Sequence, residues 1–472
     1  MRTSTMARSV LLAFSGAWIL GACSDEYPHS EVRAASFPAW LDAGPMLGHV
    51  SNDEVRLWYQ VHIADGDAGK AADVRPELQV GDGEFVAADE VRDFEQGCKV
   101  AVFRGLSGEA FTARLKSGDE ERVVHGKLAP KPSRTGRVVL AFGSCSRDSE
   151  FGRTPVFARI PEHDPDVMLF AGDNSYFIRG GTGPNRYSTT TKEGDWETLE
   201  KMLARHLQSR RLPSLQKLIS TTPCYAIWDD HDYGPNDADR DYSGKNRALA
   251  AFDSMWANPD RPEGAPEGGC ISKFRRGPIE VWMLDGRWFK KTRDANKKLV
   301  PNATIWGADQ IAWLERTLLA STAPVKVIVS GTQIFERGFV GEGHWQEAKE
   351  ERARFESFLR DNRIDGVIVL SGDRHHHELM RVGPVDGAYV YEFTSSPFQY
   401  GQKVGPIPKE RSNPTRLWGT RGNGFGLVTI DVRGERDGEL RFEIFGENGK
   451  VPNDGDTPCS RTIALGDLYY DK

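Results

Sequence analysis

The chain has 472 residues, of which 39% are hydrophobic and 27% are charged, and its formal net charge is -7 with a pI near 6.0. This length exceeds what one small core needs and predicts two domains, in a globular rather than a fibrous, disordered or membrane-embedded protein. The acidic balance leaves no basic surface for nucleic acid, and the sequence does not indicate an oligomeric state.

Residues 1–23 have the features of a targeting segment. Arg2 and Arg8 precede an apolar stretch that leads to the sequence LGAC at residues 20–23. This ending resembles a bacterial lipobox, in which the cysteine is lipidated. We therefore expect an exported lipoprotein anchored to a membrane through Cys23, on the periplasmic or outer-membrane face. An ordinary cleavage site with a chance cysteine is the alternative.

Four further cysteines leave two structures open. Export would place the chain where disulfides survive, so they could form two bridges in any of three connectivities. They could equally be free buried thiols that pack as small apolar residues. The four residues are Cys98, Cys224, Cys270 and Cys459.

Residues 35–131 alternate apolar and polar side chains in short segments separated by Gly and Asp, as at 54–62 and 99–103. This period of two predicts a small antiparallel β-sandwich, similar to a fibronectin type III domain. No group of metal-ligating residues occurs in it, so we interpret it as a structural or positioning module. Residues 130–133 are the expected linker.

Beyond the linker, apolar runs alternate with helical stretches, which is typical of an α/β domain. Helices are expected at about 196–219, 246–256, 308–319 and 347–359. Five apolar runs each end in a polar cluster, which predicts a parallel sheet that gathers functional groups along one rim. These runs are 138–142, 167–170, 224–228, 325–329 and 367–370.

The polar cluster after residues 167–170 contains Asp173 and, three residues later, Tyr176. From one turn at a strand end the two side chains can reach a common point, and a carboxylate and a phenolate are both hard oxygen donors. The alternative is a loop in which Asp173 caps a turn and Tyr176 packs.

Four motifs in this order, after a β-rich N-terminal module, resemble the PhoD-type alkaline phosphatases of the metallophosphoesterase superfamily. The resemblance implies a four-layer α/β/β/α sandwich over residues 136–466 and a polynuclear metal site at its rim. It also implies ferric iron together with calcium, and other divalent metals remain possible. The motifs are GSC at 143–145, GDNSY at 172–176, WDDHD at 228–232 and SGDRH at 371–375.

The resemblance also implies the metal ligands. By this resemblance Cys145, Asp173 and Tyr176 are ligands of the iron, and Asp173 also bridges to the second metal. Asp230 stands where the wider superfamily has an asparagine ligand, and Asn236 is a further candidate. Asp373 and His375 stand in for the paired histidine ligands of purple acid phosphatases, which share the Gly-Asp-x-x-Tyr turn.

Two residues are candidates for contact with the substrate. His231 falls where the superfamily has the histidine that contacts the phosphate and the leaving group. Arg147 is a possible phosphate clamp because its fork fits two phosphoryl oxygens, with a surface salt bridge as the alternative. His376 and His377 receive no role, since neighbouring residues of an extended chain face opposite ways.

These residues together predict an exported, metal-dependent phosphoric ester hydrolase. Metal ions lower the pKa of bound water to about 7 and polarise phosphoryl oxygens, so that a metal-bound water or hydroxide can attack a phosphate ester. A phosphomonoesterase of the alkaline phosphatase type is the first hypothesis. A phosphodiesterase or phospholipase on the same site is the second, and a non-enzymatic surface-binding lipoprotein with a structural metal site is the third.

Overall fold

The structure is a computed structural model that describes residues 35–64, 71–147, 155–177, 194–336, 343–385, 387–400, 405–407 and 413–471. The contacts divide the chain into residues 1–31 and 32–472, and every described residue belongs to the second unit. The expected signal peptide and Cys23 lie outside the described residues. Within those residues, no helix combines the length and the apolar character needed to cross a bilayer.

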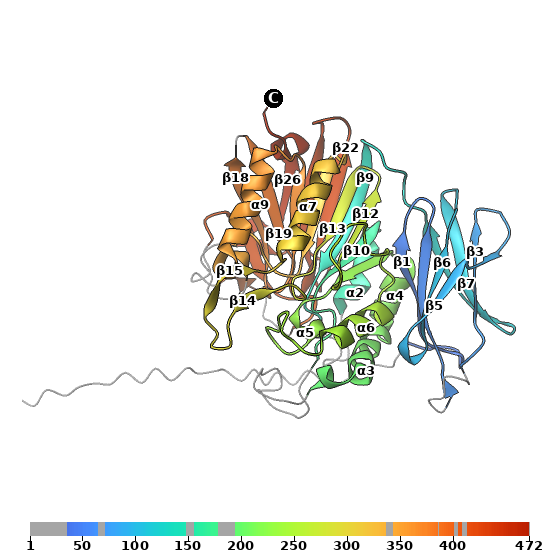
Figure 1. The fold of residues 1–472 in the computed structure, drawn as a ribbon. Coiled ribbons are helices and arrows are strands. Elements are labelled where there is room, and N and C mark those ends of the chain that lie inside the picture. The colour runs from blue at the N-terminus through green and yellow to red at the C-terminus, as the bar shows by residue number, and fades with distance from the viewer. Residues whose placement is uncertain are drawn as a thin grey trace, which may run out of the picture. The chain divides into compact units, whose positions relative to one another are not determined.

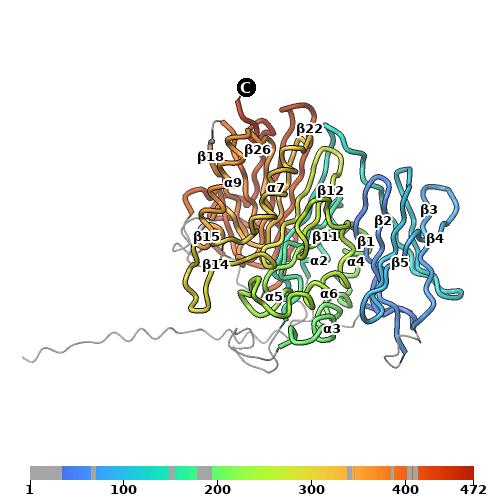
Figure 2. Tube along the Cα trace, viewed as in Figure 1, coloured from blue at the N-terminus to red at the C-terminus, as the bar shows by residue number. Residues whose placement is uncertain are grey.

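Two four-stranded antiparallel sheets form a β-sandwich at the start of the described chain (Figure 1), and the tube in Figure 2 follows the chain through it. The predicted alternation is visible in the strand Ala110–Ser117, where every second residue is buried. One sheet has the order β1(Leu41–Val50), β2(Val55–Val61), β6(Cys98–Phe103), β5(Glu90–Asp93), and the other β4(Val86–Ala87), β3(Arg75–Val80), β7(Ala110–Ser117), β8(Glu120–Lys127).

The first sheet of the following α/β part has six strands. Its strands β9, β10 and β11 run parallel, so their carboxyl ends meet at the same edge. The helices on this side include α3(Leu199–Arg210) and α4(Pro213–Thr221), which Pro213 separates as a helix-starting residue. The strand order is β11(Cys224–Ile227), β10(Val167–Ala171), β9(Gly136–Gly143), β22(Gly424–Val432), β23(Gly438–Gly446), β26(Ser460–Ala464).

The second sheet has eight strands, and β13, β16, β17 and β19 are parallel neighbours in it. The prediction of one parallel sheet for the five apolar runs is therefore wrong, because β9, β10 and β11 lie in one sheet and β16 and β17 in the other. The order is β12(Ser272–Arg276), β13(Ile279–Met283), β16(Val325–Ser330), β17(Val367–Ser371), β19(Ala388–Thr394), β18(His377–Val385), β21(Arg416–Arg421), β20(Gly405–Pro406).

Successive residues of the second sheet pack into different cores. Val327 and Leu370 belong to the cluster that also contains the strands of the first sheet, whereas Ile328 and Val369 pack with α7(Ala308–Ala320) and α9(Lys349–Asp361). Figure 1 shows α7 and α9 over this sheet. A strand buried on both faces reads as a continuous apolar run, which explains the runs in the sequence. The layers are therefore α/β/β/α, as expected.

Polar contacts fix the sandwich to the α/β part. The Trp58 indole N–H donates to the carbonyl of Ser254 at 2.7 Å, near the end of α6(Lys245–Met255). The expected linker is also held, because Ser133 N–H donates to Gly277 O at 3.0 Å. The predicted domain boundaries, 35–131 for the sandwich and 136–466 for the α/β part, stay a prediction, because contacts such as these connect the two parts.

The cysteines of the described residues are all free and buried. For Cys98, Cys224, Cys270 and Cys459 this is the alternative of free buried thiols, and not the alternative of two disulfide bridges. Burial raises the pKa of Cys98 and of Cys224 to about 12. These thiols therefore pack as small apolar side chains.

Candidate metal centre

The loops after five strands bring the predicted site residues to one place. Cys145 follows β9, Asp173 and Tyr176 follow β10, and Thr332 follows β16. Asp230 and His231 begin the short helix α5(Asp230–Tyr233) after β11, and Asp373 and His375 follow β17. Parallel strands of two packed sheets thus place side chains from distant parts of the sequence at a common edge.

The Asp173 carboxylate is the centre of this group. One oxygen, Oδ2, accepts hydrogen bonds from the Tyr176 hydroxyl at 3.0 Å and from the Cys145 thiol at 3.5 Å. The other, Oδ1, accepts the backbone N–H of His231 at 3.1 Å. The Tyr176 hydroxyl also lies 3.3 Å from Nε2 of His375. Three predicted residues therefore contact one buried carboxylate, and a fourth, His375, contacts Tyr176.

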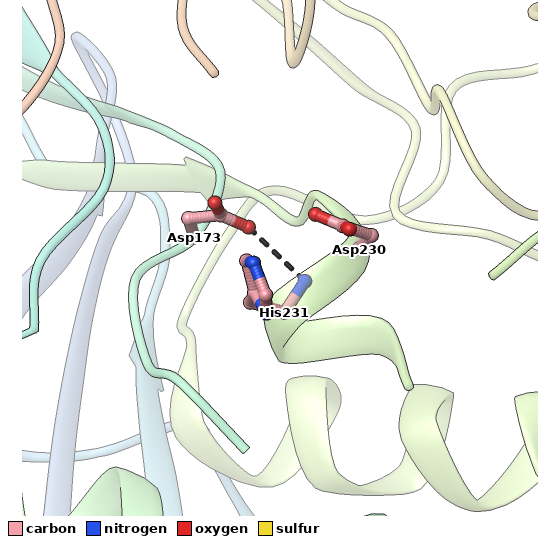
Figure 3. A group of neighbouring side chains, drawn as sticks. All are labelled: Asp173, Asp230 and His231. Carbon is pink, nitrogen blue, oxygen red and sulfur yellow. Dashed lines mark hydrogen bonds between the residues drawn. The ribbon is translucent and has the colours of Figure 1, made fainter. Parts of the chain in front are cut away.

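Asp173, Asp230 and His231 each offer a ligand atom, and these atoms all lie within 4.8 Å of one another. Figure 3 shows the two carboxylates and the imidazole, with the hydrogen bond from His231 to Asp173 dashed. The His231 ring stacks on Tyr176, with 4.3 Å between ring centroids. These side chains are buried, so an ion among them would be largely shielded from solvent.

The remaining predicted residues lie along the edge of the group. Asp373 accepts a hydrogen bond from the Thr332 hydroxyl at 3.2 Å. Asn236 and Asp373 both line a cavity of about 890 Å³. The loop that carries Asn236 folds toward the centre, because the backbone N–H of Asp237 donates to Asp230 at 2.7 Å.

Four of the predicted ligands have a left-handed backbone, namely Cys145, Asp173, Asp373 and His375, with φ of 59°, 52°, 66° and 49°. Residues other than glycine rarely adopt this conformation, and those that do are often found at functional sites. Gly172, at φ 93°, has no room for a side chain, since a Cβ would lie 2.7 Å from Cβ of Asp229. The close approach of these two loops requires glycine there.

Like charges surround the Asp173 carboxylate. Burial raises the pKa of Asp173 well above its usual value, and the carboxylates of Asp230, Asp229, Asp232 and Asp373 raise it further. Burial likewise raises the pKa of the Tyr176 hydroxyl, as does the neighbouring Asp173. A bound cation would reverse each of these effects, so the electrostatics fit a metal site.

The donor set also fits the metals that the resemblance implies. A thiolate at Cys145 and a phenolate at Tyr176 donate strongly to a trivalent ion. The carboxylates of Asp230 and Asp373 are the oxygen ligands that calcium prefers. The buried Asp/Asp/His group therefore supports metal binding.

Several residues of the centre were not predicted. The buried Arg287 guanidinium donates to Asp229 Oδ1 at 2.5 Å and lies 3.8 Å from Asp230. The Tyr400 ring packs on His375 with 3.7 Å between centroids, and the guanidinium carbon of Arg147 lies 4.5 Å from the Tyr400 ring. Asp229 was visible in the WDDHD motif, but no local pattern marks Arg287 or Tyr400.

The two unassigned histidines contact groups other than the predicted ligands. His376 lies 3.0 Å from Glu378 through Nε2 and 3.0 Å from the carbonyl of Arg374 through Nδ1. His377 Nε2 lies 2.9 Å from the carbonyl of Gly422. Both residues are buried and take part in internal hydrogen bonds.

Comparison with known proteins places this geometry in context. The chain is 26% identical over 297 residues to alkaline phosphatase D of Bacillus subtilis (strain 168), covering 56% of this chain and 50% of the relative. The chain thus spans about half the length of that relative.

Two solved structures share the fold. The structure of PhoD has a TM-score of 0.70 at 18% identity and covers 92% of each chain. The purple acid phosphatase PPD1 from yellow lupin (Lupinus luteus) seeds has a TM-score of 0.60 at 13% identity, covering 89% of this chain and 74% of that chain. At these identities the likeness concerns the fold.

A family model described as PhoD-like phosphatase matches residues 140–437, which is more than half of the chain and includes every predicted site residue except Cys23. The chain therefore belongs to the PhoD-like phosphatase family.

Proposed function

We propose that the protein hydrolyses phosphate monoesters at the centre around Asp173. The observation that carries this proposal is the position of one buried carboxylate among a thiol, a phenol and a histidine, beside a cavity lined by Asp373 and Asn236. In this proposal Cys145, Asp173, Tyr176 and His375 hold one ion. Asp230, Asn236 and Asp373, together with Asp173, would hold the other.

Ferric iron and calcium are the proposed ions. When bound, they would supply an activated water and would polarise the phosphoryl oxygens. The donor chemistry described above supports this assignment.

The protein's own side chains position and protonate the substrate in this mechanism. The His231 ring is held by its stacking on Tyr176 and the residue is 9% exposed, so it can donate a proton to the leaving-group oxygen. Arg147, which packs over Tyr400, can bind two phosphoryl oxygens through its fork. Asp229 and Arg287 orient the first turn of α5.

The proposal includes export and anchoring to a membrane through a lipid on Cys23. Its support is the sequence of residues 1–23. Replacing Cys23 by Ala should release the protein from membranes, and a variant that stays membrane-bound after a salt wash would contradict the anchor.

A phosphodiesterase is the second candidate, because the large cavity beside the centre leaves room for a second ester group. The deciding experiment measures metal content and compares kcat/KM on 4-nitrophenyl phosphate with that on bis(4-nitrophenyl) phosphate. We expect the monoester to be preferred by about tenfold or more, which corresponds to about 1.4 kcal/mol. Preference for the diester would favour the second candidate, and full metal content without turnover of either substrate would favour a non-enzymatic protein.

Iron can be tested by colour. A Tyr176 phenolate on ferric iron should give a charge-transfer band, and Tyr176→Phe should remove or shift most of it while the far-UV circular dichroism stays unchanged. An active protein without colour and without iron would point to zinc or manganese.

A further inference from the structure

The cavity of about 890 Å³ lies beside the candidate metal centre. Asp373 and Arg374 border it on the side of the centre. Residues 235–242 and the hairpin of β14(Lys291–Arg293) and β15(Leu299–Thr304) supply other lining residues. Its volume is within the range of pockets that accept a small organic molecule. If phosphate binds at the centre, the rest of the substrate has this space beside it.

Three cationic side chains of this wall, those of Lys290, Lys291 and Arg293, are paired with acids. Lys291 Nζ lies 3.3 Å from Asp239 and also contacts Asp241. On the hairpin side, Glu347 accepts from Arg293 Nε at 2.7 Å and lies 3.3 Å from Lys290 Nζ. These pairs hold the cations in the wall and reduce the positive potential that they would otherwise present.

A cation is also paired with an acid on the side of the cavity near the metal centre, where the guanidinium of Arg374 lies 3.5 Å from the Asp373 carboxylate. Among the described lining residues, carboxylates slightly outnumber cations. The carboxylates are Asp237, Asp239, Asp241, Asp294, Glu347 and Asp373, and the cations are Lys290, Lys291, Arg293, Lys297 and Arg374.

We propose that this cavity binds the leaving group of the substrate and selects an uncharged, hydroxylated group over one that carries a second phosphate. This inference rests on the proposed phosphatase function. A second phosphate would have to break an existing ion pair or lie against carboxylates, and both are unfavourable. Hydroxyl groups can donate to the carboxylates and accept from the ammonium groups while the ion pairs remain.

Glucose 6-phosphate and glucose 1,6-bisphosphate test this selection, because they differ only in the second phosphate. For the metal-loaded protein we expect kcat/KM to be about tenfold higher for the monophosphate. Asp241→Asn should reduce this preference about fivefold, since it removes one of the two carboxylates that contact Lys291 and leaves Asp239. The Asp241 side chain is 63% exposed, so the variant should fold.

The matched control is Asp361→Asn. Asp361 is similarly exposed at 62% and also contacts a basic side chain, Arg360, but lies at the end of α9 and does not line the cavity. It changes the net charge equally and should leave the preference unchanged. Wild-type preference for the bisphosphate, or an equal change in both variants, would overturn the proposal.

Calorimetric titration with the same two sugars separates this proposal from the proposed function. Absence of phosphate release from any substrate, including 4-nitrophenyl phosphate, would contradict the function. Tighter binding of the monophosphate would still support the cavity's selectivity. Tighter binding of the bisphosphate, or binding of neither sugar, would overturn it.

Discussion

Two buried carboxylates of this fold, Asp173 and Glu378, differ in how their charge is balanced. Around Asp173, burial and four further carboxylates all raise the pKa. Around Glu378, burial also raises the pKa, but His376, Arg416 and Gln333 outweigh it and lower the pKa to about 2. The Glu378 carboxylate accepts from Gln333 Nε2 at 2.5 Å and is paired with Arg416.

The difference distinguishes a site that fits a cation from a structural network. Protein groups already balance the charge of Glu378, whereas four further carboxylates raise the pKa of Asp173 although Arg287 and Arg374 contact this group of acids. The pairing of His376 with Glu378 assigns that histidine to the structural network, and its contact with the carbonyl of Arg374 braces the turn that carries Asp373.

The largest expected effect follows from Asp173→Asn. The amide keeps the shape but loses the negative charge that would bridge two ions, so metal content and activity should fall together to background. Without metal, this variant should melt at a higher temperature than the chelator-treated wild type, because it removes one charge from a group of repelling carboxylates.

Metal analysis and thermal melting with and without chelator measure both effects. An Asp173→Asn protein that retains metal and turnover would contradict the assignment of Asp173 as the central ligand.

His231→Ala should lower kcat by about 10²–10⁴-fold on an ester with a poor leaving group, which is the usual contribution of a general acid. The loss should be smaller on 4-nitrophenyl phosphate, whose leaving group needs no proton. Metal content should remain. Loss of metal would instead identify His231 as a ligand, and wild-type kcat on the poor leaving group would limit it to packing.

Glu378→Gln should lower the stability of the protein and leave its metal binding unchanged. It leaves the buried His376 and the partly buried Arg416 without their anionic partner, and breaking a buried pair in this way costs about 3–5 kcal/mol of unfolding free energy. Denaturant unfolding measures this loss, and the folded variant should bind metal at the wild-type ratio. If metal binding falls while stability is unchanged, the two carboxylate groups do not differ as described.

The last effect concerns His49, a partly buried residue that belongs to neither group. Burial, with the nearby charge of Arg56, lowers the pKa of His49 from 6.5 to about 3, and its Nδ1 lies 3.2 Å from the Tyr225 hydroxyl. Because the unfolded chain binds a proton below pH 6.5 and the folded protein does not, stability should fall as the pH decreases from 6.5 toward 3. The slope approaches about 1.4 kcal/mol per pH unit.

Unfolding of His49→Gln across this range should show a shallower pH dependence than the wild type. The exposed His62 supplies the control as His62→Gln, which should follow the wild type. Identical slopes for His49→Gln and the wild type would contradict the role of His49.

The sequence predicted the strands that end at the centre because strands buried on both faces leave continuous apolar runs, as in β10 and β17. It also predicted that Asp173 and Tyr176 reach a common point, because they share one turn. The division of the runs between two sheets was not visible in these runs, since both sheets contain parallel buried strands of the same character.

Partners from distant loops could not be predicted. Arg287 reaches Asp229 across 58 residues of sequence, and Tyr400 meets His375 only when the loop after β19 folds back. Such pairs depend on tertiary packing, which local periodicity does not encode. His376 shows the same limit, because its neighbours His375 and His377 look identical in sequence yet contact different parts of the fold.

The left-handed backbone at Cys145, Asp173, Asp373 and His375 restricts which residues evolution can exchange at these positions. Asparagine, aspartate and glycine tolerate this conformation, whereas valine, isoleucine and threonine do not, because of their branched Cβ. A change of metal preference in this family would therefore proceed most easily between aspartate and asparagine, which replaces a charged oxygen by a neutral one without moving the chain.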